Sequence, residues 1–287
     1  LARAGGEAYD PDRLERFQTL HADLLAWTET PRPAPTASVA AFEHAAFIDA
    51  YFSNYIEGTE FGVDEAIQIV FGGLVPEQRP ADAHDVMGTF RIVSSREEMG
   101  MSLADPRYDF EDLRRVLCRR HEVIMAARPE RRPGEFKTQA NFVGNTAFVE
   151  PELVTGTLRR GFELFRSLRG PFTRAAFMMF LVSEVHPFTD GNGRIARIMT
   201  NAELVSAGEH RIIIPTVYRE DYVLGLRALT RQGRTEGFLR MLDHAQEFVS
   251  RIDFQNLDAA LTTLRGANAF AEPSEARLIL PPMGASA

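Results

Sequence analysis

The sequence predicts a mainly α-helical protein that contains one small β element. Apolar residues recur at intervals of three and four along most of the 287 residues, which is the spacing of a helix with one buried face. Residues 129–151 break this pattern, because they mix Thr, Phe, Val, Asn and Gly between prolines, as hairpins and loops do. Hydrophobic residues make up 45% of the chain, enough for a buried core in one large domain or two modest ones.

Composition also limits the classes of function. With 32 Lys and Arg against 40 Asp and Glu, the net charge of −8 disfavours nucleic acid as a partner. No apolar run approaches the roughly 18 residues that cross a bilayer, so no membrane contact is expected. The start of the chain has no apolar signal core. Because the first residue is Leu1, the earlier removal of an upstream segment stays an alternative. The single Cys118 excludes an internal disulfide, and we expect a soluble, cytoplasmic protein.

The helices can be placed by their apolar faces and by the residues that end them. A first helix is expected over 11–28, and the prolines of 31–35 then form a stiff connector. A second helix is expected over 37–57, because Gly58 readily adopts the positive φ that follows a helix. Further helices are expected at 63–71, 81–99, 110–127, 152–168, 172–184, 193–206, 219–231 and 235–267, before an irregular tail at 272–287.

One segment concentrates residues that can carry chemistry, His186-Pro-Phe-Thr-Asp-Gly-Asn-Gly-Arg-Ile-Ala-Arg197. An apolar helix leads into His186, and a glycine-rich turn follows before the next helix begins at about Arg194. The first N–H groups of a helix lack partners and carry partial positive charge, so they favour an anion. The glycines of the turn let a ligand approach the backbone closely.

The side chains of this segment fit a phosphate ligand and a proton transfer. Arg194 and Arg197 are three residues apart on one helix, and guanidinium groups bind phosphate oxygens in bidentate fashion. Asp190 supplies the oxygen that Mg²⁺ prefers, and His186 titrates near neutral pH. Together these groups suit phosphoryl or nucleotidyl transfer onto a hydroxyl. The plainer alternative is a helix–helix loop with two solvated arginines.

Residues 186–197 resemble the signature of the Fic family, His-Pro-Phe-x-(Asp/Glu)-Gly-Asn-(Gly/Lys)-Arg-x-x-Arg, without any departure. The resemblance implies an all-α Fic fold, a helical bundle with a small β-hairpin flap. It also implies a protein adenylyltransferase, which transfers AMP from ATP onto a Tyr, Thr or Ser hydroxyl of a target protein and releases pyrophosphate. Gly193 favours AMP transfer over the reactions of relatives with Lys at this position.

The resemblance assigns roles to the residues of the motif. His186 would deprotonate the target hydroxyl, and Asp190 would bind Mg²⁺ between the α- and β-phosphates. Arg194 would contact the β-phosphate region and Arg197 the γ-phosphate. The α-phosphate would be held by Asn192 together with the backbone amides around Gly191 and Gly193.

The hairpin expected at 136–148 resembles the family's flap, which pairs with the backbone of the target and closes over the nucleotide. Its expected nucleotide contacts are Val143, Gly144, Asn145 and Thr146. Lys137 stands where many relatives carry Arg, which affects the anchoring of the flap. Tyr222 is the best match to an aromatic residue of the adenine pocket.

A second motif, Ser53-Asn-Tyr-Ile-Glu57-Gly58, resembles the family's inhibitory sequence (Ser/Thr)-x-x-x-Glu-(Gly/Asn). Its place before the catalytic motif matches the class in which the inhibitory helix precedes the core. Ser53 and Glu57 share a helix face, and we expect Glu57 to pair with Arg197 in place of the γ-phosphate. The alternative is a helix end whose Glu57 faces water.

These expectations divide the chain into an N-terminal helical region at 1–100 with the inhibitory helix at about 37–58, a catalytic core at 101–250, and a C-terminal helix and tail at 251–287. Two other functions stay open: removal of AMP from a target with the help of Glu57, and nucleotide sensing without catalysis. The sequence is also compatible with self-modification or a homo-oligomer as a means of relieving inhibition.

Overall fold

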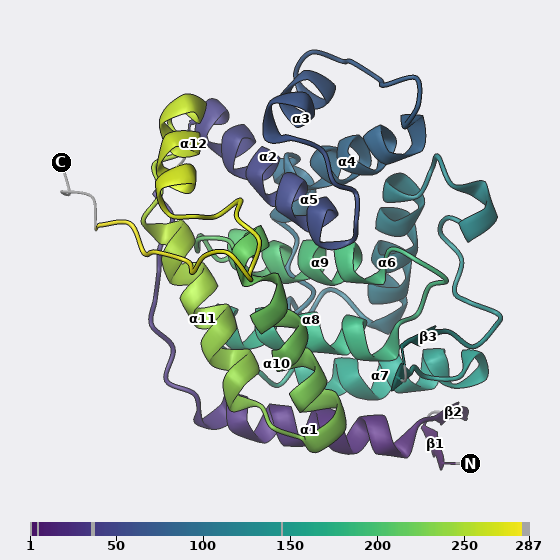
Figure 1. Ribbon diagram of the computed structural model, residues 1–287. Coiled ribbons are helices and arrows are strands. Elements are labelled where there is room, and N and C mark those ends of the chain that lie inside the picture. The colour runs from purple at the N-terminus through teal and green to yellow at the C-terminus, as the bar shows by residue number, and fades with distance from the viewer. Residues whose placement is uncertain (1, 5, 36–37, 145, 283–287) are drawn as a thin grey trace.

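The computed structural model describes residues 2–4, 6–35, 38–144 and 146–282, and it has the expected all-α fold (Figure 1). The described residues form twelve α-helices, in chain order α1 Pro11–Ala26, α2 Val39–Ile56, α3 Val63–Val70, α4 Pro80–Val93, α5 Arg96–Met99, α6 Phe110–Ile124, α7 Val154–Phe165, α8 Pro171–Val185, α9 Asn192–Ser206, α10 Arg219–Gln232, α11 Glu236–Ser250 and α12 Leu257–Gly266. The shorter elements are the 3-10 helices η1 Pro129–Arg131, η2 Pro151–Leu153 and η3 Thr216–Tyr218, and the strands β1 Ala2–Ala4, β2 Glu7–Tyr9, β3 Phe142–Val143 and β4 Thr146–Ala147. The strands form two separate antiparallel pairs, β1 with β2 and β3 with β4.

Helices α8 and α9 lie at the centre of the molecule and pack against each other. The side chains of α8 are buried on nearly every side, including Phe177, Phe180 and Leu181. A helix that is apolar all round is stable only when neighbours cover it completely. Helices α1, α7 and α11 cover α8, while α2, α4, α5 and α6 pack against α9. The loop between α8 and α9, which carries the signature, is therefore held by two central helices that their neighbours cover.

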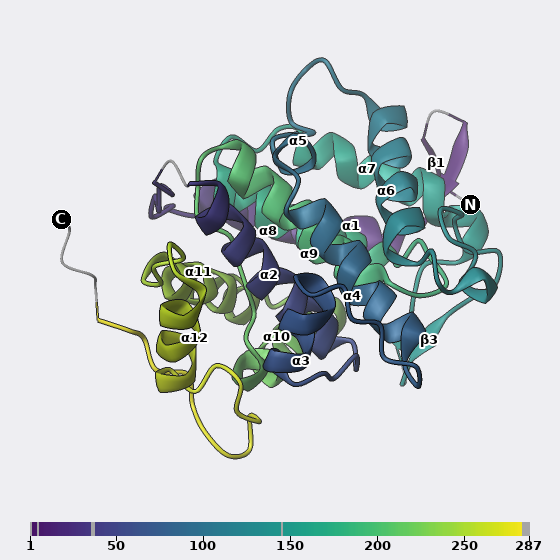
Figure 2. The ribbon, with the colours of Figure 1, turned by 90° about the horizontal axis from the view of Figure 1, so that it is seen from above.

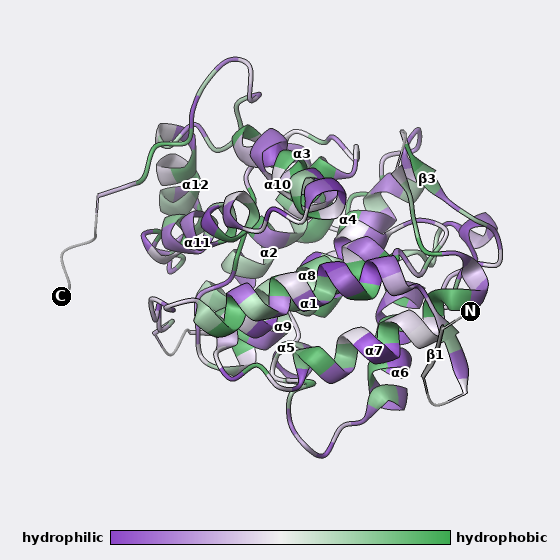
Figure 3. Cartoon of the chain, turned by 90° about the horizontal axis from the view of Figure 1, so that it is seen from below, coloured by the Kyte–Doolittle hydropathy of each residue, from purple (hydrophilic) through white to green (hydrophobic). Residues whose placement is uncertain are grey.

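The other helices complete this arrangement. Seen from above, α2 and α4 lie over α9, and α10 and α11 pack side by side (Figure 2). Seen from below, hydrophilic and hydrophobic positions alternate along the helices, as expected for elements with one buried face (Figure 3). None of the helices in the described ranges is long and apolar enough to span a bilayer.

Two of the expected helices are each divided in the structure. The expected helix at 81–99 is broken between α4 and α5, where the Ser95 hydroxyl accepts the N–H of Glu98 and starts a new helix. The expected helix at 235–267 is α11 and α12, separated by residues 251–256. Asp253 accepts the N–H of Gln255, and Asn256 caps α12 through the N–H of Ala259. These short polar side chains stabilise a turn where the apolar pattern alone predicts a continuous helix.

The β structure also differs from expectation. The flap has strands of two residues each, with Phe142 opposite Ala147 and Val143 opposite Thr146, and the rest of 136–148 is irregular. The β1–β2 pair at the N-terminus was not predicted, and β2 packs on α7. Gly156 permits this contact, because a Cβ there would lie 2.1 Å from the Ala8 carbonyl oxygen. The proposed division at residues 100 and 250 stays a prediction.

Candidate active site

The signature forms a tight loop between α8 and α9. His186 ends α8 with a left-handed backbone, at φ 53° and ψ 58°, and its N–H still bonds the Val182 carbonyl. Gly191 precedes α9 and is also left-handed, at φ 75°, which glycine adopts without strain. A Cβ on Gly191 would lie 3.0 Å from the sulfur of Met125. The chain thus reverses within six residues and directs the first N–H groups of α9 toward the loop.

The hydrogen bonds of His186 fix its tautomer. Its Nδ1 lies 3.1 Å from the Ser183 carbonyl, which can only accept, so Nδ1 carries the proton and Nε2 keeps its lone pair. The ring stacks on Phe148 of the flap, with centroids 3.7 Å apart and planes 7° apart. Burial lowers the pKa of His186 to about 4, and Lys137 adds to this effect. The imidazole is therefore neutral at physiological pH, as a general base requires.

The loop is braced by side chains from within it and from α6. Asn192 accepts the N–H of Phe188 and donates to its carbonyl, both at 2.8 Å. His121 of α6 stacks on the Phe188 ring at 3.8 Å and accepts the N–H of Gly134 at Nδ1. Its Nε2–H therefore donates to the Asp190 carbonyl at 3.0 Å. The Asn192 side chain is engaged in these loop contacts, so its backbone N–H is the group available to an α-phosphate.

Asp190 lies at the mouth of the loop with its side chain 41% exposed. Its Oδ1 accepts the N–H of Gly191 at 2.7 Å, and its Oδ2 lies 3.6 Å from Nε of Arg131. No group of three or more His, Cys, Asp or Glu side chains gathers to hold a metal in the described ranges. Mg²⁺ commonly takes one or two carboxylates and completes its shell with phosphates and water. A single exposed carboxylate beside an anion site fits that mode of binding.

Arg197 is held by the expected inhibitory helix. Its Nε donates to the Ser53 hydroxyl at 2.9 Å, and its Nη2 donates to the Ser53 carbonyl at 2.8 Å and to Glu57 Oε1 at 2.6 Å. The guanidinium is 3% exposed, whereas the Glu57 side chain is 28% exposed. Burial is the largest single influence and raises the pKa of Glu57, but the charge and hydrogen bond of Arg197, together with the charge of Arg194, hold that pKa below its usual range. The salt bridge expected from the sequence is thus present.

Gly193 makes room for this salt bridge. A Cβ on Gly193 would lie 2.2 Å from Glu57 Oε1 and 3.2 Å from Arg197 Nη1. The Glu57 carboxylate therefore lies directly against the backbone at the start of α9, where phosphate oxygens are expected to bind. Gly58 follows at φ 88°, in the conformation that ends a helix, and a Cβ there would meet no atom within 4 Å. Its positive φ is the feature that requires glycine.

Arg194 is held by a carboxylate that the sequence did not indicate. Its Nη1 lies 2.9 Å from Asp85 Oδ2 of α4, and both side chains are nearly inaccessible, at 4% and 2%. The same Asp85 oxygen accepts a hydrogen bond from Arg128 at 2.9 Å. Among the described residues, Arg194 Nε and Arg197 Nη1 are buried without a hydrogen-bond partner. Two unpaired donors beside a helix start are suited to the oxygens of an incoming anion.

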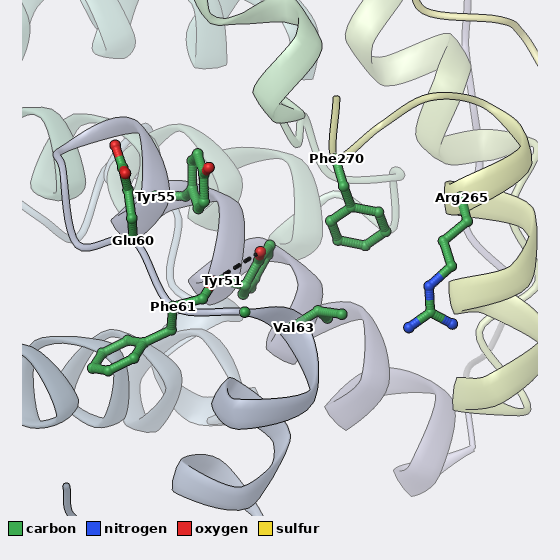
Figure 4. A pocket seen from close by; sticks show the side chains of 8 residues that line it. Tyr51, Tyr55, Glu60, Phe61, Val63, Arg265 and Phe270 are labelled. Atoms are coloured by element: carbon green, nitrogen blue, oxygen red, sulfur yellow. Dashed lines mark hydrogen bonds between the residues drawn. The ribbon is translucent and has the colours of Figure 1, made fainter. Parts of the chain in front are cut away.

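Helix α2 is fixed to α9 by a row of buried polar contacts. One turn before Ser53, Asp49 accepts hydrogen bonds from Asn201 at 2.9 Å and Arg211 at 3.0 Å. The opposite face of α2 carries Tyr51 and Tyr55, which line a pocket of about 390 Å³ together with Phe270 (Figure 4). The Tyr51 hydroxyl bonds the Phe61 carbonyl at 3.1 Å. Both faces of the helix that carries Glu57 are thus in contact with the rest of the protein.

The base of the flap is attached to the loop between α8 and α9. The N–H of Lys137 bonds the Pro187 carbonyl at 2.8 Å, and its Nζ bonds Asn141 Oδ1 at 2.6 Å. Asn141 in turn donates to the Phe188 carbonyl at 2.9 Å. Burial lowers the pKa of Lys137 to about 8. Lys137, noted in the sequence as a departure from many relatives, therefore anchors the flap through Asn141.

The remaining expected nucleotide contacts lie in different environments. Val143 and Gly144 are exposed at the tip of the flap, and the Thr146 hydroxyl accepts a hydrogen bond from Arg231 at 3.0 Å. Asn145 lies outside the described residues. Tyr222 is only 3% exposed, with the Arg197 guanidinium 5.9 Å from its ring centroid. It contributes to the wall behind Arg197, and its contact with adenine stays a prediction.

Sequence reasoning missed three groups that shape the site: His121, Asp85 and the Phe148 ring. His121 belongs to no motif in the sequence, although its two nitrogens organise the loop. Phe148 was included in the flap without a role. Asp85 is one of two acidic residues on α4, and only the fold shows that it faces Arg194. Contacts between helices far apart in the chain leave no local signal in one sequence.

Comparisons with known proteins agree with this geometry. A family model described as the Fic/DOC family matches residues 111–204. The "Protein adenylyltransferase fic-1" of Caenorhabditis elegans is 26% identical over 211 residues, which cover 71% of this chain and 41% of that protein. The "Protein adenylyltransferase Fic" of Nematostella vectensis is 27% identical over 78% of this chain and 50% of its own length. The chain thus spans half or less of these relatives.

Solved structures show the same fold. A structure of Fic-1 from C. elegans superposes with a TM-score of 0.60 at 19% identity, covering 89% of this chain and 73% of that one. A Fic family protein from Desulfovibrio desulfuricans gives a TM-score of 0.58 at 17% identity, over 91% of this chain and 76% of the other. The signature at 186–197 lies inside the segment that is similar to the Fic/DOC family, residues 111–204.

Proposed function

We propose that this chain is a protein adenylyltransferase that transfers AMP from ATP to a hydroxyl side chain of a target protein. The observation that carries the proposal is a neutral His186, with Nε2 unprotonated, beside a helix start that holds two arginines. A base and an anion site in one loop are what nucleotidyl transfer onto a hydroxyl requires. The names of the matched relatives support this reaction.

The proposed transfer uses the residues of the loop as follows. Nε2 of His186 accepts the proton of the target hydroxyl, and the hydroxyl oxygen forms a bond to the α-phosphorus. The bond between that phosphorus and the α–β bridging oxygen breaks, and pyrophosphate leaves with the bonding electrons. Backbone N–H groups from Gly191 to Gly193 hold the α-phosphate oxygens, and Arg194 and Arg197 bind the outer phosphates.

Asp190 would hold Mg²⁺, which neutralises phosphate charge when bound. The target would add a strand to the flap, where Phe142 and Val143 are 63% and 55% exposed. Strand addition orients a hydroxyl through backbone hydrogen bonds and makes few demands on the sequence of the target. Self-modification would use the same docking mode.

The Glu57 carboxylate acts as a brake in this proposal. Its Oε1 pairs with Arg197 Nη2 at 2.6 Å and lies against Gly193. The γ-phosphate and the carboxylate would therefore compete for one site. ATP could then bind only weakly or with its α-phosphate turned away from the attacking hydroxyl. Misplacement of about 1 Å is enough to suppress a transfer reaction by roughly 100-fold.

Removal of the brake tests the proposal directly. The Glu57→Gly variant, given ATP labelled on its α-phosphate and Mg²⁺, is expected to label itself and proteins of a lysate much more strongly than the wild type. Equal labelling of the two proteins would remove Glu57 from the inhibitory role. Mass spectrometry of the labelled protein identifies the modified hydroxyl.

A second variant separates chemistry from binding. Glu57→Gly combined with His186→Ala is expected to bind ATP, measured by calorimetry, and to transfer no label. Transfer by this double variant would show that His186 is not the base. If AMP disappears from a pre-labelled target when wild type is added, the chain also catalyses removal.

A further inference from the structure

Arg13 of α1 connects two parts of the active site, although it lies outside the segment matched by the family model. One end of its guanidinium, Nη2, donates to the Ala147 carbonyl of β4 at 2.5 Å. The other end, Nη1, forms an ion pair with Glu184 Oε1 at 2.7 Å. The side chain is 18% exposed, so the planar fork is largely enclosed between the flap and α8. Such a fork can bridge two acceptors that a single ammonium group cannot hold at once.

The contact of Arg13 with the flap affects the surroundings of His186. Ala147 is followed by Phe148, whose ring lies parallel to the imidazole at 3.7 Å. Fixing the Ala147 carbonyl therefore fixes the backbone from which Phe148 projects. The stacked ring is a cause of the burial that keeps His186 neutral.

The other end of the bridge is anchored on the helix that carries His186. Glu184 precedes His186 by two residues and is only 2% exposed. Its second oxygen accepts a hydrogen bond from the Thr230 hydroxyl at 2.6 Å, so the carboxylate cannot turn freely. A buried carboxylate needs a charged partner, and Arg13 supplies it. The bridge thus ties the flap to the last turn of α8.

We propose that Arg13 is a positioning residue for the transfer reaction, which holds Phe148 over His186 by joining the flap to Glu184. The inference rests on the proposed function for its catalytic meaning, and its structural part is independent of it. A flap held from α1 is closed over His186 before any target arrives. Docking of the target then meets a preformed strand and a base in a fixed orientation.

The test measures how well Phe148 covers His186, without using activity. Diethyl pyrocarbonate acylates neutral imidazoles, and peptide mass spectrometry follows each histidine separately. Arg13→Ala is expected to raise the rate at His186 several-fold. Exposed His84 should react quickly and buried His121 slowly in every variant. Acceleration at His121 as well would indicate general loosening and would overturn the proposal.

Matched variants sharpen the result. Arg160→Ala removes an arginine of α7 that pairs with Glu163 at 2.5 Å rather than with the flap or Glu184, so it should leave the His186 rate unchanged. Arg13→Lys keeps the charge without the fork and should give an intermediate rate. Glu184→Gln removes the anchor with little change of shape and should resemble Arg13→Ala. Wild-type rates at His186 in both Arg13→Ala and Glu184→Gln would overturn the proposal.

Activity provides the second readout. In the Glu57→Gly background, Arg13→Ala is expected to reduce labelling while ATP affinity stays unchanged, because Arg13 touches no phosphate-binding group. If Arg13→Ala exposes His186 but labelling stays complete, the positioning role of Arg13 is overturned, whereas the structural bridge still stands. If no variant labels any protein while the His186 rates follow the expected order, the proposed function fails and the structural bridge stands.

Discussion

At the scale of single residues, His186 offers a direct check of the proposed chemistry. Its pKa is lowered to about 4, mainly by burial and also by the charge of Lys137, while the Ser183 carbonyl, Glu57 and Asp190 act in the opposite direction. We therefore expect the imidazole to stay neutral well below the ordinary histidine pKa of about 6.5. NMR of ¹⁵N-labelled histidine, assigned with His186→Asn, should show its titration near pH 4. A midpoint near the ordinary value would mean that Phe148 does not cover the ring in solution.

The ion pair of Glu57 predicts how the free energy of unfolding depends on pH. Because Arg197 keeps its pKa below that of an unfolded glutamate, the carboxylate stabilises the fold above the unfolded pKa of about 4.3. This contribution is lost as the pH falls through the lower pKa of the folded state. Urea unfolding of wild type and Glu57→Gln should thus differ at neutral pH and converge in acid. A difference that persists unchanged in acid would contradict the salt bridge.

At the scale of elements, α2 is held to α9 by the contacts of Asp49. Asp49→Ala would leave Arg211 charged and buried without its partner, since both side chains are 5% exposed. We expect the free energy of unfolding to fall by about 3–5 kcal/mol. The matched control is Asp64→Ala, whose 87% exposed carboxylate pairs with Arg265 at 3.4 Å and should cost under about 1 kcal/mol. Similar losses in both variants, measured in urea, would contradict a special role of the buried pair.

The elements also show what the sequence can and cannot predict. The helices around the core were predictable because their apolar faces repeat at helical spacing, and the loop 186–192 because its turn residues and charges are contiguous. The division of 235–267 was missed, since it depends on Asp253 and Asn256 bonding to the nearby backbone. The partners Asp85 and Arg13 were missed for another reason. They reach the site from α4 and α1, and only tertiary packing determines which of many charged residues does so.

At the scale of the whole molecule, α1 covers part of the central helix α8. Phe17 packs on Phe177 and Phe180 of α8, with centroid distances of 6.1 and 5.8 Å. Removal of residues 1–35 would expose this apolar surface of the central helix. The truncated protein is expected to bind a hydrophobic dye, lose near-UV circular dichroism and unfold without a sharp transition. A cooperative, dye-free truncated protein would show that residues 36–287 fold without α1.

The row of contacts along α2 ends at Glu57, and this position has a consequence for regulation. Asp49 and Ser53 are buried, so drawing the entire helix away from α9 would disrupt the core, whereas the glutamate at its tip is accessible to solvent. A regulator of the proposed activity would therefore need to displace one side chain only. If the chain transfers AMP as proposed, ATP would compete with a tethered carboxylate whose local concentration is constant. The supply of ATP, or a change near the helix end, would then set how often the carboxylate occupies the site.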